Sequence, residues 1–162
     1  MVRPLVSSDR EAIERILVEV GIFTAAEIAC ALEQVDIYLQ QPGQKDYRLV
    51  VVENNQAEVA GFMSYGPTPL TEGTYDLYWV AVSPQNQRKG YGQLLLQYLE
   101  KQVEKEKGRM VLIETSSQPK YSGTRSFYEN LGYREVARVP DFYRPGDDRI
   151  TYLKRFEEKK EK

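Results

Sequence analysis

The stretch 85–93 reads QNQRKGYGQ and separates the apolar run YDLYWVAV from the helix-like run LLLQYLEKQVEKEKG. It holds two glycines, two cations and no acid. Glycine tolerates unusual backbone angles and lets a ligand approach the main chain, while the first turn of a helix has unpaired N–H donors and a partial positive charge. This junction between a strand and a helix therefore predicts a backbone cradle for an anion. The alternative is that both glycines only begin the helix tightly.

The junction does not match the common nucleotide motifs. A P-loop requires Gly-Lys followed by Ser or Thr, and the sequence contains no such run. A dinucleotide fingerprint would require glycine at position 95, which is Leu95. The spacing that fits is Gln/Arg-x-x-Gly-x-Gly/Ala between a strand and a helix.

The length of the chain limits the number of domains, and its charge limits the kinds of binding partner. A chain of 162 residues with 41% hydrophobic residues is long enough for one well-packed core, so we expect a single domain over 1–156 and a charged tail over 157–162. Twenty-two basic and 24 acidic residues argue against a nucleic-acid or anionic-membrane partner. The sequence shows neither a leader-like start nor a long apolar span, which indicates the cytosol.

The sequence contains no histidine and a single cysteine, Cys30. Nucleophiles that depend on a neighbouring histidine are therefore excluded, as are zinc sites with imidazole ligands or a thiolate cluster. We expect no metal. Acid–base chemistry must come from Glu, Asp, Tyr, Lys or water.

Hydrophobic periodicity predicts an α/β domain in which helices flank a mixed central sheet, in the order β-α-α-β-β-β-α-β-α-β-β. Ser8 is the candidate N-cap of the first helix, and Gly21 ends that helix. We expect the strand 110–116 to be central, and a ligand at the carboxyl ends of 74–82 and 110–116. The expected strands are 2–6, 47–54, 58–66, 74–82, 110–116, 133–139 and 149–156; the expected helices are 9–20, 25–41, 94–107 and 119–131; 140–148 is expected to be a loop.

Several of these motifs together resemble the GNAT-superfamily N-acetyltransferases. The likeness rests on WVAVSP, on QRKGYG with its helix LLLQYLE, and on FYENLGY, and it covers most of the chain. It implies that acetyl-CoA is the acetyl donor and that amides of the junction hold its pyrophosphate. It also implies that a strand splayed at a bulge offers main-chain groups to the pantetheine arm and the acetyl carbonyl. The residues so assigned are Gln87, Arg88, Lys89, Gly90, Tyr91 and Gly92 for the pyrophosphate, and Val80, Ala81 and Val82 for the splayed strand.

The same resemblance suggests the catalytic groups. Tyr128 matches the tyrosine that many members place beside the coenzyme sulfur as general acid; alternatively it is a core aromatic. Glu114 resembles the base of ribosomal-protein N-terminal acetyltransferases, and Asp76 lies where histone-type members carry a glutamate base; either could instead be a surface carboxylate. Tyr121 stands where many members have asparagine, so whether Tyr121 and Arg125 contact the coenzyme or the substrate stays open.

The acceptor is the least constrained part of the prediction. The segment 140–148, PDFYRPGDD, offers Phe142, Tyr143 and three acids, Asp141, Asp147 and Asp148, which would suit a cationic amine. It also loosely resembles a loop of protein N-terminal acetyltransferases. The predicted activity is transfer of acetyl by direct attack of a primary amine, either a small amine or a peptide N-terminus, and a homodimer is possible. The rivals are a non-catalytic acyl-CoA-binding module and a plain interaction domain.

Overall fold

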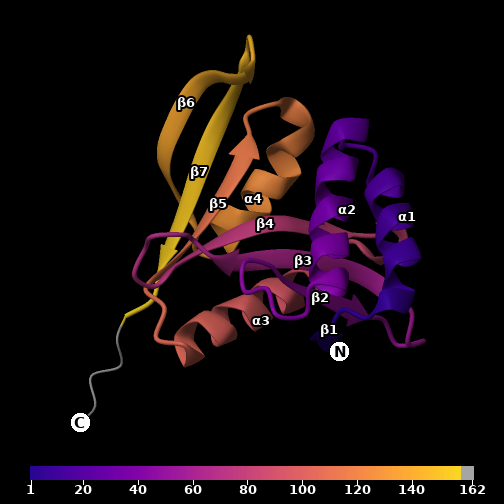
Figure 1. The fold of residues 1–162 in the computed structure, drawn as a ribbon. Helices are drawn as coiled ribbons and strands as arrows, with labels where there is room; N and C mark the ends of the chain where they lie inside the picture. The colour runs from indigo at the N-terminus through magenta and orange to yellow at the C-terminus, as the bar shows by residue number, and fades with distance from the viewer. Residues whose placement is uncertain (158–162) are drawn as a thin grey trace.

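The computed structural model describes residues 1–157 as one seven-stranded sheet with helices on both faces (Figure 1). Most of the predicted charged tail, residues 158–162, lies outside the described part of the chain. The helices are α1 (Arg10–Val20), α2 (Ala25–Gln40), α3 (Tyr91–Lys105) and α4 (Ser122–Asn130); the strands are β1 (Val2–Pro4), β2 (Arg48–Glu53), β3 (Val59–Pro67), β4 (Thr74–Val82), β5 (Met110–Ser116), β6 (Arg134–Arg144) and β7 (Asp147–Arg155).

The strands follow the order β1-β2-β3-β4-β5-β7-β6 across the sheet. Only β4 and β5 pair in parallel; the other neighbours pair antiparallel. The parallel pair is joined through α3, because a parallel connection requires a long crossover. The predicted mixed sheet and element order are confirmed, and β5 lies in the interior of the sheet as expected.

Alternation along β2 explains why both faces of the sheet are covered. Leu49 and Val51 pack in the cluster that contains the apolar residues of α1 and α2, whereas Val50 and Val52 pack with those of α3. Successive strand side chains point to opposite faces, so one run of apolar residues serves two layers. The helices α1 and α2 therefore cover one face, and α3 covers the other with the buried Tyr128 of α4 (Figure 1).

The start of α1 differs from the prediction. Asp9, not Ser8, is its N-cap residue, and Ser7–Asp9 form a short 3₁₀ turn. The Arg3 guanidinium donates to both carboxylate oxygens of Asp9, at 2.8 and 3.0 Å, and the Val6 N–H donates to Oδ2 at 2.9 Å. This tie to β1 outweighs the local preference for Ser8. The end is as predicted, because Gly21 adopts the left-handed conformation at φ 77°.

The segment 140–148 is not the predicted loop. Instead β6 continues to Arg144 and β7 begins at Asp147, so the two strands meet in a tight turn. The register shifts between Val139 and Arg144, where Asp141 has a φ of 53°. The Asp141 side chain accepts from the Gly146 N–H at 2.7 Å. Turn-forming residues here build a bulged hairpin at the sheet edge, where proline is tolerated.

Candidate active site

The site begins where β4 and β5 stop pairing. Their parallel ladder runs from Thr74 with Met110 to Leu77 with Ile113, although both strands continue beyond it. On its other side β4 shifts register against β3, so that Tyr78 has no partner between Leu77 and Trp79. A bulge bends the strand that carries it. The two strands therefore separate, as predicted, and a cleft opens between their carboxyl ends.

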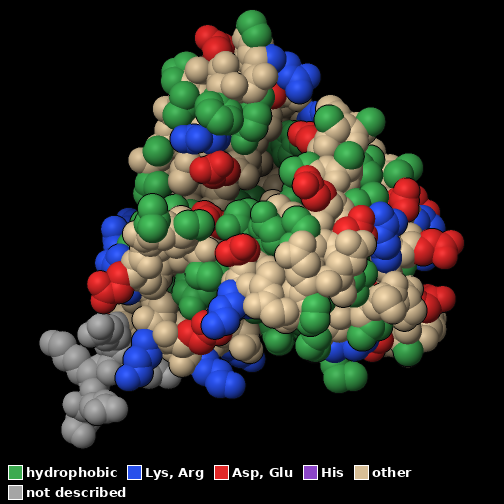
Figure 2. Space-filling model, in the orientation of Figure 1, with side chains coloured by type: hydrophobic (Ala, Val, Ile, Leu, Met, Phe, Trp, Pro, Cys, Tyr) green, Lys and Arg blue, Asp and Glu red, His purple; other side chains and the backbone are tan. Residues whose placement is uncertain are grey.

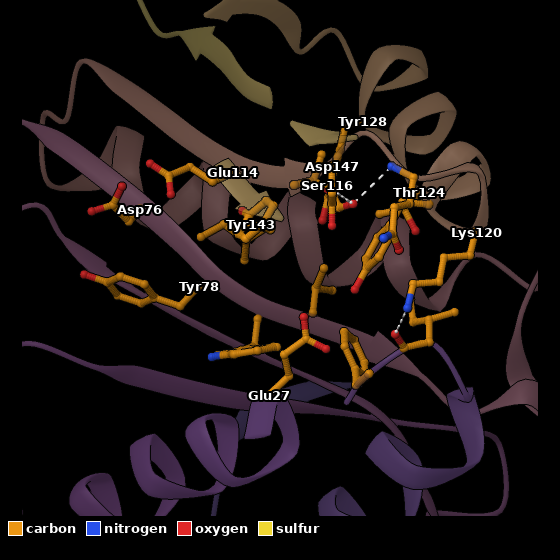
Figure 3. Close-up of a pocket in the computed structure, with 18 of the residues that line it drawn as sticks. Glu27, Asp76, Tyr78, Glu114, Ser116, Lys120, Thr124, Tyr128, Tyr143 and Asp147 are labelled. Atoms are coloured by element: carbon orange, nitrogen blue, oxygen red, sulfur yellow. Dashed lines mark hydrogen bonds between the residues drawn. The ribbon is translucent and has the colours of Figure 1, made fainter. Parts of the chain in front are cut away.

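The cleft has a volume of about 490 Å³. Its walls come from the ends of β4 and β5, the α1–α2 connection, the start of α4 and the β6–β7 turn. Figure 2 shows this face of the molecule hollowed between the β6–β7 end of the sheet and the N-terminal helices. Asp76, Glu114 and Tyr128 all line the cleft (Figure 3), so the structure brings the three candidate catalytic residues together.

Tyr128 belongs to both the core and the cleft. It is 5% exposed and packs against the rings of Phe127, Tyr133 and Tyr152, with centroids 5.6 to 6.3 Å away. Burial, with a smaller effect from Tyr121, raises the pKa of Tyr128 well above its ordinary value. The phenol is therefore protonated throughout the neutral range, and it can donate a proton but not accept one.

The two candidate bases lie on one face of the sheet. Leu77 and Ile113 belong to the core cluster of α3, so Asp76 and Glu114, each one residue away, point to the opposite face. Figure 3 shows them side by side. The side chain of Glu114 is 53% exposed and lies 4.0 Å from Nη1 of Arg149. Oδ2 of Asp76 accepts a hydrogen bond from Thr68 Oγ1 at 2.7 Å, so this carboxylate already has a partner.

The junction presents free amides. Arg88 and Gly90 adopt left-handed conformations, with φ of 61° and 87°. Within residues 1–157 no acceptor is found for the backbone N–H groups of residues 87–92. A Cβ built on Gly90 would meet nothing within 4 Å, whereas one on Gly92 would lie 3.1 Å from Phe127 Cζ. The first glycine is therefore open to a ligand, and the absence of a side chain at the second is explained by close packing of α3 and α4.

Strand alternation separates the three residues expected on β4. The Ser83 N–H donates to the Ala60 carbonyl at 2.8 Å, and the ladder with β3 continues from that pair. Residue pairs along an antiparallel ladder alternate between hydrogen-bonded and non-hydrogen-bonded pairs. Ala81, two residues before Ser83, therefore directs its main-chain groups to β3, whereas Val80 and Val82 direct theirs away from β3, toward the splay. The Val82 carbonyl accepts from Gln87 Nε2 at 3.1 Å. Val80 thus offers both of its main-chain groups to the cleft, whereas the Val82 carbonyl already has a partner.

Other residues of the cleft had no clear signal in the sequence. Glu27 caps α2 through the Thr24 N–H at 2.6 Å and also faces the cleft, and its capping box was the only hint. Lys120 Nζ donates to the Ile22 carbonyl at 3.0 Å and joins the start of α4 to the α1–α2 connection. The remaining lining residues that the sequence did not single out are Ile22, Phe23, Leu77, Tyr78, Trp79, Thr115, Ser116, Gln118 and Arg144.

Tyr121 and Arg125, whose contacts the sequence left open, differ in their position relative to the cleft. Tyr121 lines the cleft, and burial together with Glu27 and Asp147 raises its pKa to about 12. Arg125 is not among the lining residues; its Nη1 donates to the carbonyls of Ser116 and Gln118, at 2.8 and 2.9 Å. Arg125 therefore fixes the turn after β5.

The residues expected to form the acceptor wall divide into two groups. Tyr143 and Asp147 line the cleft, whereas Asp141, Phe142 and Asp148 do not. The two carboxylates outside it serve the hairpin, because Asp148 Oδ1 accepts from the Asp141 N–H at 2.9 Å and Asp141 accepts from the turn. Asp147 is the acid of this segment that belongs to the site.

The described residues contain neither a membrane-spanning helix nor a metal-binding cluster. No helix in residues 1–157 is sufficiently long and apolar to cross a membrane. The same residues contain no group of three or more His, Cys, Asp or Glu side chains arranged to hold a metal ion.

A splayed parallel strand pair, free amides at a helix start, and a buried tyrosine that lines the same cleft as two carboxylates define a candidate acyltransferase site. The family model described as "Acetyltransferase (GNAT) domain" matches residues 45–135, more than half of the chain. The chain therefore belongs to the GNAT acetyltransferase family, and the predicted family and enzyme class are confirmed.

Solved structures agree with this assignment. A GNAT-family protein from Desulfovibrio desulfuricans is 39% identical, covers 96% of this chain and 98% of its own, and superposes with a TM-score of 0.90. The ribosomal-protein-S18-alanine N-acetyltransferase of Escherichia coli is 18% identical, with 100% and 98% covered and a TM-score of 0.76. An acetyltransferase of Salmonella typhimurium, solved with acetyl-CoA, is 21% identical, with 100% and 96% covered and a TM-score of 0.73. The last two likenesses show the fold alone. A comparison with curated proteins found no match.

Proposed function

We propose that the protein transfers the acetyl group of acetyl-CoA to a primary amine by direct attack, without a covalent enzyme intermediate. Family membership supports acetyl-CoA as the donor, and the acetyltransferase of Salmonella typhimurium was solved with that cofactor. The observation that carries the proposal is the end of β4–β5 pairing at Leu77 and Ile113, beyond which the Val80 main-chain groups face the cleft that Tyr128 lines. A thioester arm laid along β4 would present its carbonyl to them.

The junction supplies the other end of the donor site. Free amides between Gln87 and Gly92 lie at the positive end of α3, where a diphosphate is stabilised by N–H donors and by the helix dipole. Arg88 and Lys89 add positive charge next to these donors. In this arrangement Gly90 leaves the space that a phosphate oxygen requires.

In the proposed reaction the neutral amine nitrogen forms a bond to the thioester carbonyl carbon, and the C–S bond then breaks. The Val80 N–H stabilises the oxyanion, a kind of contact worth about 3 to 4 kcal/mol in enzymes where it has been removed. The Tyr128 phenol gives its proton to the departing thiolate and is reprotonated from solvent. The amine proton passes to a carboxylate through water.

We assign the base to Glu114 in preference to Asp76. Both carboxylates face the cleft, but Asp76 is held by Thr68 at 2.7 Å while Glu114 is largely open to water that could relay the proton. The exposure of Glu114 also means that it can return the proton to solvent after each turnover.

The test is thiol release from acetyl-CoA across a panel of small amines and peptides, with product identified by mass. Acetylated amine formed together with free thiol supports the proposal. Tight acetyl-CoA binding without release on any acceptor would instead favour the acyl-CoA-binding module, and absence of acetyl-CoA binding would favour an interaction domain. The cytosolic location, the homodimer, the lack of a nucleic-acid partner and the single-domain organisation stay predictions.

A further inference from the structure

Asp147 is a buried carboxylate that the proposed reaction does not use. Its side chain is 5% exposed, yet it lines the cleft. Oδ1 accepts a hydrogen bond from Ser116 Oγ at 2.5 Å. Within residues 1–157 Oδ2 accepts no hydrogen bond, and its ion-pair contact is Arg144 Nε at 3.7 Å, beyond hydrogen-bond distance.

Oδ2 reaches the cleft and is not sealed in the core. Among the described side chains, every fully buried polar atom has a hydrogen-bond partner except Nε of Arg149. Oδ2 of Asp147 accepts no hydrogen bond and is not one of these fully buried atoms, so it must be in contact with solvent. The cleft provides that contact, since Asp147 is among its lining residues (Figure 3). The open lone pair of Oδ2 can therefore accept from a donor or cation of a ligand that enters the cleft.

The surroundings of Asp147 favour a cation. Four carboxylates line the cleft, Glu27, Asp76, Glu114 and Asp147, against two cations. The cations are Lys120, which is tied to the Ile22 carbonyl, and Arg144, whose side chain is 56% exposed and lies toward solvent. The walls between the acids are aromatic, formed by Phe23, Tyr78, Trp79, Tyr121 and Tyr143. Aromatic faces next to carboxylates are suited to ammonium groups.

The position of Asp147 relative to Glu114 sets the size of the ligand. Ser116, which holds Asp147, lies two residues beyond Glu114 on the same face of β5. A strand rises about 3.3 Å per residue, so a cation on Asp147 would lie roughly 7 Å along the strand from an amine beside Glu114. A short alkyl spacer of a few carbon atoms spans that separation.

From this geometry we infer that the acceptor is a small diamine, one of whose nitrogen atoms is acetylated beside Glu114 while the second, as an ammonium group, binds Asp147 Oδ2. The inference rests on the proposed function for the reacting amine, but it concerns binding and can be tested without turnover. A peptide N-terminus would bring no second cation to Asp147 unless a side chain supplied one.

The test compares diaminobutane with butylamine, which has the same length and lacks the second charge. Binding is measured by calorimetry on the full chain saturated with CoA, and turnover is measured separately by thiol release. The diamine is expected to bind about 10- to 100-fold more tightly than the monoamine, as expected for a hydrogen bond to a charged partner. Equal binding of the two amines would overturn the inference.

Substitutions at and around Asp147 test whether the diamine preference arises at this carboxylate. Asp147→Asn keeps the shape and the Ser116 contact, and should remove most of the diamine preference. Asp148→Asn is the matched control, because Asp148 lies outside the cleft; this variant should keep the diamine preference. Arg144→Ala should strengthen diamine binding severalfold, because the competing cation is gone. Thermal unfolding measures whether each variant is folded. If Asp147→Asn does not fold, Arg144→Ala provides the test instead. Weaker binding of the diamine by Arg144→Ala would contradict the inference.

The two readouts separate the inference from the proposed function. Diamine binding that depends on Asp147, without thiol release, supports the cation site and contradicts the enzymatic proposal. Release with monoamines or peptides but no Asp147-dependent binding leaves the acetyltransferase intact and overturns the diamine. Absence of both overturns both.

Discussion

A Cβ on Gly92 would lie 3.1 Å from Cζ of Phe127, so the first turn of α3 and the ring from α4 are in direct contact. This contact sets how closely the two helices approach beside the splay. Gly92→Ala should therefore gain little of the roughly 1 kcal/mol that alanine normally adds over glycine in a helix, because the Phe127 ring must shift to admit the methyl group. Denaturant titration measures the change.

The matched comparison uses the other glycine of the junction. Gly90→Ala meets no atom within 4 Å but forces alanine to φ 87°, so its cost comes from backbone strain. Phe127→Leu should relieve Gly92→Ala and leave the cost of Gly90→Ala unchanged. Relief of both variants, or of neither, would contradict the packing account.

Tyr128→Phe should lower kcat by about 100-fold or more, which is typical for loss of a general acid. Acetyl-CoA affinity should be nearly unchanged, because the ring stays and packs as before. Steady-state kinetics with parallel calorimetry provide both values. Turnover equal to that of the native protein would remove Tyr128 from the acid role.

Glu114→Gln should lower kcat/KM by about 100-fold at neutral pH, while Asp76→Asn should have a small effect. The reason is that Asp76 is bonded to Thr68 whereas Glu114 is open to the relaying water. Rates compared across pH distinguish the two. The reverse order of effects would assign the base to Asp76, and two small effects would leave the proton to water or substrate.

The buried tyrosines predict a loss of stability at alkaline pH. Burial raises the pKa of Tyr128 and Tyr133 above their ordinary value, and for Tyr133 the neighbouring Glu100 adds to the effect. Both phenols stay protonated in the folded chain but ionise near pH 10 once unfolded, so the unfolded state binds fewer protons above that pH. The stabilisation is present below about pH 10 and is lost as pH rises further.

Tyr133→Phe tests this directly through the slope of unfolding free energy against pH. Between the unfolded and folded pKa values the slope should become less steep by about 1.4 kcal/mol per pH unit, the value for one proton. An unchanged slope would show that Tyr133 does not contribute.

The sequence predicts the central strands best, because their boundaries depend on local patterning. Expected and observed ranges agree for 74–82 and 110–116. Predictions failed where a specific side-chain hydrogen bond, which hydrophobic patterning does not show, decides the structure. Arg3, on β1, moves the N-cap of α1 from Ser8 to Asp9, and side chains of Asp141 and Asp148 turn the expected loop into a hairpin.

The site shows the same limit. The family resemblance assigned Tyr128, Glu114 and Asp76, and the structure places all three on the cleft. The sequence offered Asp141, Asp147 and Asp148 together for a cationic amine and could not single out Asp147, because its partner Ser116 is 31 residues away along the chain. Neither could the contact of Gly92 with Phe127, which joins two separate helices.

The most direct measurement of the central claim is calorimetry of the intact protein with acetyl-CoA and, in parallel, with S-acetyl-pantetheine, which has the thioester arm but no diphosphate. Free amides at 87–92 predict one acetyl-CoA per chain and much weaker binding of the truncated donor. Equal affinity for the two, or no association with acetyl-CoA at high concentration, would contradict the account.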